Sequence, residues 1–254
     1  MADSVIVEHL DRVLVISINR PQARNAINRE VTEVIAAAVD ELDERADLSL
    51  GIITGTGGNF CAGMDLKAFL AGEDVTLPGR GIAGIVQCPP RKPMIAAVEG
   101  WALAAGFEIA LTCDLIVAAQ DARFGLPEVK RGLVAAAGGL LRLPRRIPPS
   151  IAMQLALTGE PLSAVDASRL GLVNELTAPG QALDGALDLA RRITPNGPLA
   201  VQITKQILDQ ALDWTVAEGF SRQEPLVAQV LASADAREGA AAFTEKRPPA
   251  WTGR

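Results

Sequence analysis

The chain has 254 residues, of which 49% are hydrophobic, and a formal net charge of −6. This length and composition suffice for one large domain, or a core with an appendage, around a sizeable apolar interior. The acidic balance and an aromatic content of only 4% argue against nucleic-acid binding, because phosphate contacts need a basic face and base stacking needs aromatic rings. We therefore expect no nucleic-acid partner.

The cysteines and the first residues indicate a compartment. Cys61, Cys88 and Cys113 are an odd number without C-x-x-C spacing, so neither a disulfide framework nor a thiolate metal cage is indicated. Residues 1–4 lack the features of a signal peptide, and no apolar run reaches the roughly 18 residues that a membrane helix needs. We expect a cytoplasmic protein without a membrane association.

The N-terminal segment is expected to form a β-hairpin. Residues 4–10 and 13–19 are rich in strand formers, with Asp11 and Arg12 as the turn. His9, the only histidine, is therefore expected to be a solvated strand residue. A single histidine argues against a Ser-His-Asp hydrolase and against a zinc site built on several imidazoles.

The next segment predicts a β-α-β unit. Asn28 is expected to cap a helix with an apolar face from Val31 to Leu42, and residues 48–54 read as a buried strand, so a parallel sheet covered by helices is predicted. Gly55–Gly58 do not complete a dinucleotide-binding fingerprint, because Phe60 replaces its third glycine.

Residues 60–66 have the composition of a ligand-binding loop. Their small side chains would let a ligand approach the backbone, and a helix is expected from Asp65. Cys61 is open to two interpretations, a nucleophile or a packed thiol, and the absence of a nearby histidine favours the second. Residues 71–92, rich in glycine and proline, are expected to form a mobile segment with short helical pieces beside the site.

Two glutamates organise the middle of the chain. Glu108 precedes an apolar helical run, and Glu128 follows a short strand at 115–118 and the turn Gly125–Pro127. Burying carboxylates is unfavourable by several kcal/mol unless they are paired or protonated. A helix start and a strand-end loop would present both to one cleft for general acid and base chemistry. The alternative is that Glu108 caps a helix and Glu128 is an exposed loop acid.

The rest of the chain is mainly helical. Arg142, Arg145 and Arg146 have two interpretations, contacts to phosphates or solvation of a helix end, and the second is favoured. Ser163 is expected to cap a helix at 164–170. Helical periods then occupy 148–157, 181–193, 198–212, 216–233 and 235–245. We expect a core at 1–194 and a helical region at 195–254 whose apolar faces pack on the core or on a second subunit.

Three blocks in this order and spacing resemble the crotonase, or enoyl-CoA hydratase/isomerase, superfamily over essentially the whole chain. They are Arg20-Pro21 with Asn25-Ala26, then residues 60–66, then residues 101–108 continuing through Cys113-Asp114 to residues 124–128. The ending, residues 242–247 with Trp251, resembles the carnitinyl-CoA dehydratase branch. The resemblance implies an α/β fold, a ClpP-like spiral of β-β-α units with a C-terminal helical trimerisation region, and trimers or hexamers.

The resemblance also implies an acyl-CoA thioester as substrate and a set of site residues. Two backbone N–H groups would form an oxyanion hole, at positions matching Met64 and Ala105. Positions matching the CoA site are Arg24, Ala62, Asp65, Leu66 and Lys67. Glu108 and Glu128 match the two glutamates of the family's hydratases, in which they hold the attacking water. Glu128 would deliver a proton to the α-carbon, with no metal and no cofactor beyond the coenzyme A of the substrate.

The expected activity is therefore an enoyl-CoA hydratase of fatty acid metabolism, a lyase that adds water to an α,β-unsaturated thioester or removes it. Alternatives are an enoyl-CoA isomerase, a decarboxylase, a thioester hydrolase or a silent acyl-CoA-binding homologue. Two departures from the family pattern bear on specificity. Ala105 stands where glycine is common, which matters if that residue needs a positive φ, and residues 135–137 replace a proline-containing stretch.

Overall fold

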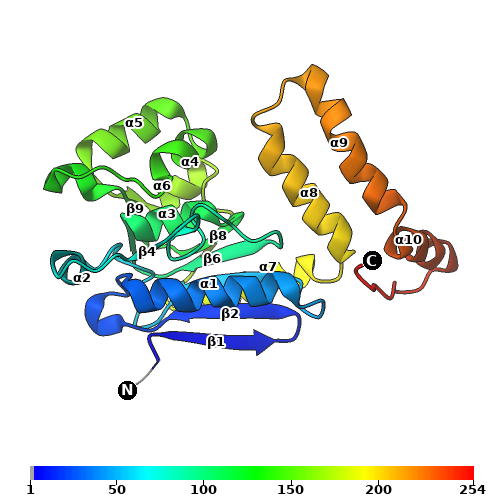
Figure 1. Cartoon of the computed structure of the whole chain (residues 1–254), viewed down its shortest axis with the longest axis horizontal. Helices are drawn as coiled ribbons and strands as arrows, with labels where there is room; N and C mark the ends of the chain where they lie inside the picture. Colours follow the sequence, from blue (N-terminus) through cyan, green and yellow to red (C-terminus); the bar gives the residue numbers. More distant parts are fainter. Residues whose placement is uncertain (1–2) are drawn as a thin grey trace.

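The computed structural model describes residues 3–254 as an α/β fold built on a six-stranded sheet (Figure 1). The strand order is β1-β2-β3-β6-β8-β11, in which β1 pairs antiparallel with β2 and every other neighbouring pair is parallel. These strands are β1 (Val5–Leu10), β2 (Val13–Ile18), β3 (Leu50–Gly55), β6 (Met94–Val98), β8 (Leu115–Ala119) and β11 (Glu175–Thr177). The expected hairpin at the N-terminus and the parallel sheet are thus confirmed. The expectation that residues 1–4 do not belong to a signal peptide concerns in part residues 1 and 2, which lie outside the described residues.

Both faces of the sheet are covered, which explains why its strands read as continuous apolar runs. Side chains of β2 alternate between two cores: Leu14 and Ile16 pack toward α1 (Arg29–Glu44), whereas Val13 and Val15 pack toward α7 (Ala182–Ile193). The side chain of Asn28 accepts a hydrogen bond from the N–H of Val31, so it caps α1 as the sequence predicts.

A second, smaller sheet lies next to the first and carries the loops of the site. Its strands are β7 (Trp101–Leu103), β9 (Arg123–Gly125) and β10 (Leu162–Ser163), in the order β10-β9-β7, and Cys61 extends it through a parallel bridge to Ala102. Three strands of the large sheet, β3, β6 and β8, are therefore each followed by a segment of the second layer, namely Cys61, β7 and β9, and then by a helix or 3-10 turn. This repeat is the spiral of β-β-α units that the resemblance implies.

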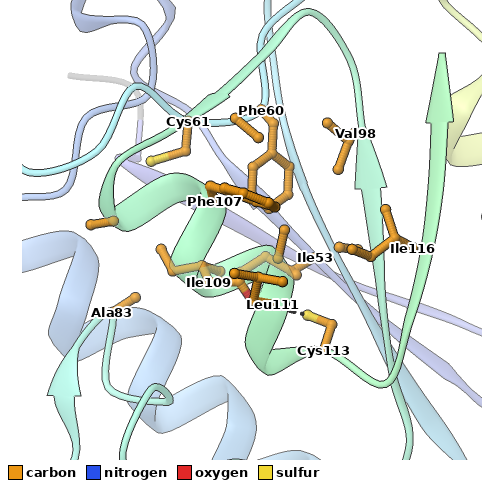
Figure 2. Packing of buried hydrophobic residues seen from close by; sticks show 14 of the residues in the cluster. Ile53, Phe60, Cys61, Ala83, Val98, Phe107, Ile109, Leu111, Cys113 and Ile116 are labelled. Atoms are coloured by element: carbon orange, nitrogen blue, oxygen red, sulfur yellow. Dashed lines mark hydrogen bonds between the residues drawn. The ribbon is translucent and has the colours of Figure 1, made fainter. Parts of the chain in front are cut away.

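Helices α2 (Leu66–Leu70) and α3 (Ala105–Thr112) follow the first two of these repeats. Beyond them lie α4 (Gly139–Arg146), α5 (Pro149–Thr158) and α6 (Ala164–Arg169), with 3-10 turns η1 (Pro21–Ala23) and η2 (Pro127–Arg131). Ser163 accepts a hydrogen bond from the N–H of Asp166 and caps α6, as predicted. Figure 2 shows the apolar interior around α3, which includes Phe60 and Phe107. The rings of Phe107 and Phe124 lie 5.3 Å apart between centroids.

Residues 71–92 differ from expectation, because they contain a small hairpin and no helix. Strands β4 (Thr76–Leu77) and β5 (Gly81–Ile82) pair antiparallel across a turn in which Gly79 and Gly81 have positive φ. The segment is held on α1: the guanidinium of Arg80 donates to Asp40 at 2.6 Å, and the hydroxyl of Thr32 donates to the carbonyl of Val75 at 2.8 Å. The expectation of short helical pieces was wrong, because these long-range contacts satisfy the backbone of a glycine-rich turn instead.

Three helices at the C-terminus, α8 (Pro198–Ala211), α9 (Val216–Leu231) and α10 (Ala234–Glu245), project beside the sheet region (Figure 1). Lys205 attaches α8 to the core: its ammonium donates to the carbonyls of Pro90 and Lys92 and to the carboxylate of Asp114. The division at residue 195 into a core and an assembly region stays a prediction. No helix among residues 3–254 is long and apolar enough to cross a membrane.

Candidate active site

A cavity of about 410 Å³ lies where the loops after β3, β7 and β9 meet. The two predicted glutamates, Glu108 and Glu128, both line it. Its remaining wall is mostly apolar and includes Leu66, Phe69, Val75, Ile82, Val86, Leu133 and Val134. One concave site therefore combines two carboxylates with an apolar surface, the combination that is typical of binding sites for small organic substrates.

The backbone N–H groups of Met64 and Ala105, both beside the cavity, are among those with no protein acceptor within residues 3–254. In the extended segment around Met64, the neighbouring polar groups bond to Ile27, because the N–H of Ile27 donates to the carbonyl of Gly63 and the N–H of Asp65 donates to the carbonyl of Ile27. The N–H of Met64 therefore points away from Ile27. Ala105 is the first residue of α3, where an N–H has no partner in its own helix.

Gly63 brings these two N–H groups together. A Cβ at this position would lie 2.8 Å from the Cβ of Ala104 and 3.3 Å from the nitrogen of Ala105, and Gly63 has a φ of +102°. Any larger residue would push the two segments apart. The strained residue next to the site is Ala104, with a φ of 52° and a ψ of −128°, whereas Ala105 has no positive φ. The alanine at 105 is thus compatible with the local backbone.

Glu108 is held deep in the site. It lies in the first turn of α3, its exposed fraction is only 2%, and its Oε1 accepts hydrogen bonds from the N–H groups of Ala137 (2.8 Å) and Gly139 (2.9 Å). Its Oε2 accepts no hydrogen bond from residues 3–254 and is not sealed from solvent, so this oxygen is the one available to the cavity. Burial raises the pKa of Glu108, and the two N–H donors and the nearby Arg142 oppose that rise.

Glu128 has the opposite surroundings. It lies in the first turn of η2, and its Oε2 is buried without a hydrogen-bond partner within residues 3–254. Burial, together with repulsion from Glu108, raises the pKa of this carboxyl, while a hydrogen bond from its own backbone N–H opposes the rise. A buried oxygen without a donor favours the protonated acid, whereas two donors at Glu108 favour the carboxylate. The two carboxyls therefore lie in different hydrogen-bonding environments.

Among the residues matched to a CoA site, Arg24, Ala62 and Leu66 line the cavity. Asp65 and Lys67 do not: the carboxylate of Asp65 caps α2 and pairs with Arg20 at 2.9 Å, and Lys67 is exposed. Cys61 is fully buried and is therefore a packed thiol, as favoured from the sequence. Burial raises the pKa of this thiol to about 12, which disfavours the thiolate that a nucleophile needs.

The sequence placed residues 71–92 beside the site, and residues of this segment do line the cavity, but it did not predict the hairpin β4–β5 that supplies part of the wall. Sequence reasoning also missed the contacts of two arginines. Arg142 and Arg146 are not solvated helix-end residues: they donate to the carbonyls of Val86 and Cys113, at 2.7 and 2.5 Å. Of the three arginines only Arg145 fits the favoured interpretation, since it is exposed and pairs with Asp213. These two contacts could not be predicted from the sequence, because every residue carries a main-chain carbonyl and none is marked as the acceptor for a distant guanidinium.

Comparison with known proteins agrees with the fold. The profile of the enoyl-CoA hydratase/isomerase family matches residues 8–254. The chain is 38% identical to carnitinyl-CoA dehydratase of Proteus mirabilis, with both chains fully covered, and 37% identical to the probable enoyl-CoA hydratase echA8 of Mycobacterium tuberculosis, with 99% of each covered. A crystal structure of an enoyl-CoA hydratase from Mycobacterium marinum is similar at 58% identity and a TM-score of 0.97, over 99% of this chain and 100% of that one. The chain belongs to the enoyl-CoA hydratase/isomerase family, the crotonase superfamily.

Proposed function

We propose that this protein is an acyl-CoA hydro-lyase that adds water across an α,β-unsaturated acyl-CoA thioester, or removes it in the reverse direction. The observation that carries the proposal is the meeting of two differently tuned carboxyls and two unpaired backbone N–H groups in one cavity. Relatives named enoyl-CoA hydratase, carnitinyl-CoA dehydratase and 2,3-dehydroadipyl-CoA hydratase support this class of reaction.

The N–H groups of Met64 and Ala105 would bind the thioester oxygen. When water attacks the β-carbon, negative charge moves onto that oxygen in an enolate-like transition state, and two fixed donors stabilise it. The loss of one such donor in comparable sites raises the barrier by roughly 3 kcal/mol. The positive end of the α3 dipole lies at Ala105 and acts in the same direction.

The two glutamates would then divide the proton chemistry. The free Oε2 of the Glu108 carboxylate accepts a hydrogen bond from the water and takes its proton as the oxygen attacks the β-carbon. Protonated Glu128 also orients the water and gives its proton to the α-carbon of the enolate. One O–H bond of the water and the π bond of the C=C break, one C–O and one C–H bond form, and a proton that passes from Glu108 to Glu128 through solvent restores the starting state of both carboxyls. The proposed reaction uses these two side chains together with the backbone N–H groups of Met64 and Ala105 and the coenzyme A of the substrate.

The apolar wall favours a hydrocarbon acyl group over one that carries a charge at its far end. Among residues 3–254, the basic side chains that line the cavity are those of Arg24 and Arg131, and both are exposed. A buried charge without a partner would be strongly unfavourable. We infer a simple enoyl substrate such as crotonyl-CoA or a longer homologue, in keeping with fatty acid metabolism in the cytoplasm.

The test is hydration of crotonyl-CoA by the purified protein, followed as loss of the conjugated-enoyl absorbance. Glu108→Gln and Glu128→Gln are expected to reduce kcat by at least about 100-fold. Glu160→Gln, a change at an exposed glutamate outside the cavity, is the matched control and should behave as the parent. Retention of the parent rate by either cavity variant would contradict the proposed roles.

We also propose that the protein assembles into trimers or hexamers through its C-terminal helices. Large apolar side chains are exposed on and between α8 and α9 of the single chain: Leu208, Leu212, Val216, Phe220 and Leu231. Such a surface is typical of an interface. Light scattering after size-exclusion chromatography is expected to give a mass of three or six subunits, and Phe220→Asp is expected to lower it; a monomeric parent would contradict this proposal.

A further inference from the structure

Arg142 lies at the point where the turn that holds Glu108 meets the wall of the cavity. It is in the first turn of α4, and its backbone N–H donates to the carbonyl of Gly138 at 2.9 Å. Its guanidinium covers the same glycine, since a Cβ at Gly138 would lie 2.2 Å from Nη1 of Arg142. Gly138 has a φ of +97° and stands between Ala137 and Gly139, whose N–H groups bind Glu108.

The same guanidinium reaches across to the hairpin side of the cavity. Its Nη2 donates to the carbonyl of Val86 at 2.7 Å, and Val86 is a buried residue of the apolar wall. One side chain therefore joins two segments that lie 56 residues apart in sequence. A charged donor on a main-chain carbonyl forms a stronger hydrogen bond than a neutral one, so this link resists movement of the turn relative to the wall.

The charge of Arg142 has no carboxylate in direct contact among residues 3–254. Glu108 is influenced by Arg142 from α4, and Glu128 from η2 is in turn influenced by Glu108. Arg142 in turn is influenced by Arg146 on its own helix, by Asp209 of α8 and by the thiol of Cys113. A positive charge near a buried carboxylate favours the ionised form, which the proposed base needs.

From this placement we infer that Arg142 is a positioning residue for Glu108: it fixes the 137–139 turn against the Val86 wall and supplies the positive charge that faces the Glu108 carboxylate. The inference rests on the proposed hydration only for the catalytic role of Glu108 as the base. The link itself, and the effect of the charge on Glu108, exist whatever reaction the cavity carries out.

The test uses the full-length protein with Arg142→Met, which keeps an unbranched side chain and removes the charge. Arg145→Met is the matched control, because Arg145 is on the same helix but exposed and paired with Asp213. Infrared difference spectra across pH follow the C=O band of protonated Glu108, assigned by its loss in Glu108→Gln. Arg142→Met is expected to shift the titration of Glu108 to higher pH, and Arg145→Met is expected to leave it unchanged. Arg142→Lys, which keeps the charge, should titrate close to the parent.

Kinetics on crotonyl-CoA give the second readout. Arg142→Met is expected to lower kcat about tenfold or more with a smaller change in KM, and to move the acid limb of the pH profile upward. Arg142→Lys should restore the acid limb but only part of kcat. Circular dichroism checks folding, and Arg142→Gln replaces the Met variant if that one does not fold.

The two readouts separate the two proposals. An unchanged titration of Glu108 in the neutral variant overturns the role of Arg142, even if the parent hydrates crotonyl-CoA well. A shifted titration with an unchanged kcat in an active enzyme also overturns the positioning role. If the parent has no hydratase activity, the proposed function fails, and the infrared titration alone decides whether Arg142 acts on Glu108.

Discussion

Replacing Gly63 by alanine tests whether the close approach of two backbone segments builds the oxyanion hole. The added Cβ would lie 2.8 Å from the Cβ of Ala104, 3.0 Å from the carbonyl oxygen of Leu103 and 3.3 Å from the nitrogen of Ala105. The segments must separate by several tenths of an ångström, which misplaces the N–H of Met64 or Ala105. Loss of one donor raises the barrier by roughly 3 kcal/mol, which corresponds to about a 100-fold lower kcat.

A second effect of this substitution has to be separated from the first. Gly63 has a positive φ, so any side chain destabilises the fold by about 1–2 kcal/mol through backbone strain alone. Gly171→Ala is the matched control: its φ is +81°, yet nothing lies within 4 Å of the added Cβ, and it is outside the cavity. Gly171→Ala should lose only the stability that backbone strain removes, Gly63→Ala should lose more because its Cβ also clashes, and only Gly63→Ala should lose kcat on crotonyl-CoA. A Gly63→Ala enzyme with a kcat within about threefold of the parent would refute the reasoning.

Three further predictions follow from the same contacts. The raised pKa of Glu128 means that the folded state binds the proton of this carboxyl more tightly than the unfolded state, so the protein loses stability as pH rises above the ordinary pKa of 4.5. Glu128→Gln cannot ionise and should therefore become more stable relative to the parent as pH rises through this range. A stability difference between the two proteins that does not change with pH would contradict the raised pKa. Gly139→Ala would place a Cβ 2.9 Å from Cγ of Glu108, so kcat should fall about tenfold while the affinity for a saturated acyl-CoA changes little; equal losses in both would indicate a collapsed cavity instead. Lys205→Met removes the ammonium that joins α8 to Asp114, and an unfolding free energy lower by about 3 kcal/mol is expected by chemical denaturation, whereas a loss below about 0.5 kcal/mol would mean that α8 is attached by its apolar contacts.

Local signals in the sequence predicted much of the framework. The caps at Asn28 and Ser163 depend on side chains within a few residues of each other, so the local sequence is enough to predict them. The burial of Glu108 was also predictable locally, because a glutamate in the first turn of an apolar helix is buried together with that helix. The resemblance to the family then predicted which N–H groups would border the cavity.

What the sequence did not predict depends on contacts between distant segments. The hairpin β4–β5 needs the pairing of Arg80 with Asp40 on α1, and a glycine-rich stretch alone does not specify a partner 40 residues away. The bond of Arg142 to a carbonyl has no side-chain signature at its acceptor. The backbone strain falls at Ala104 rather than Ala105, a shift of one residue that only the geometry of the turn before α3 decides.

The most direct test of the central claim is the fate of solvent atoms when crotonyl-CoA is turned over. In water labelled with deuterium and oxygen-18, we expect a 3-hydroxyacyl-CoA product that carries one deuterium on the α-carbon and one oxygen-18 on the β-carbon, with neither label incorporated by Glu128→Gln. Mass spectrometry and NMR of the product locate both labels. A product with a shifted double bond and no oxygen-18, or release of free coenzyme A with the label in a carboxylate, would contradict hydration and assign the cavity to another reaction.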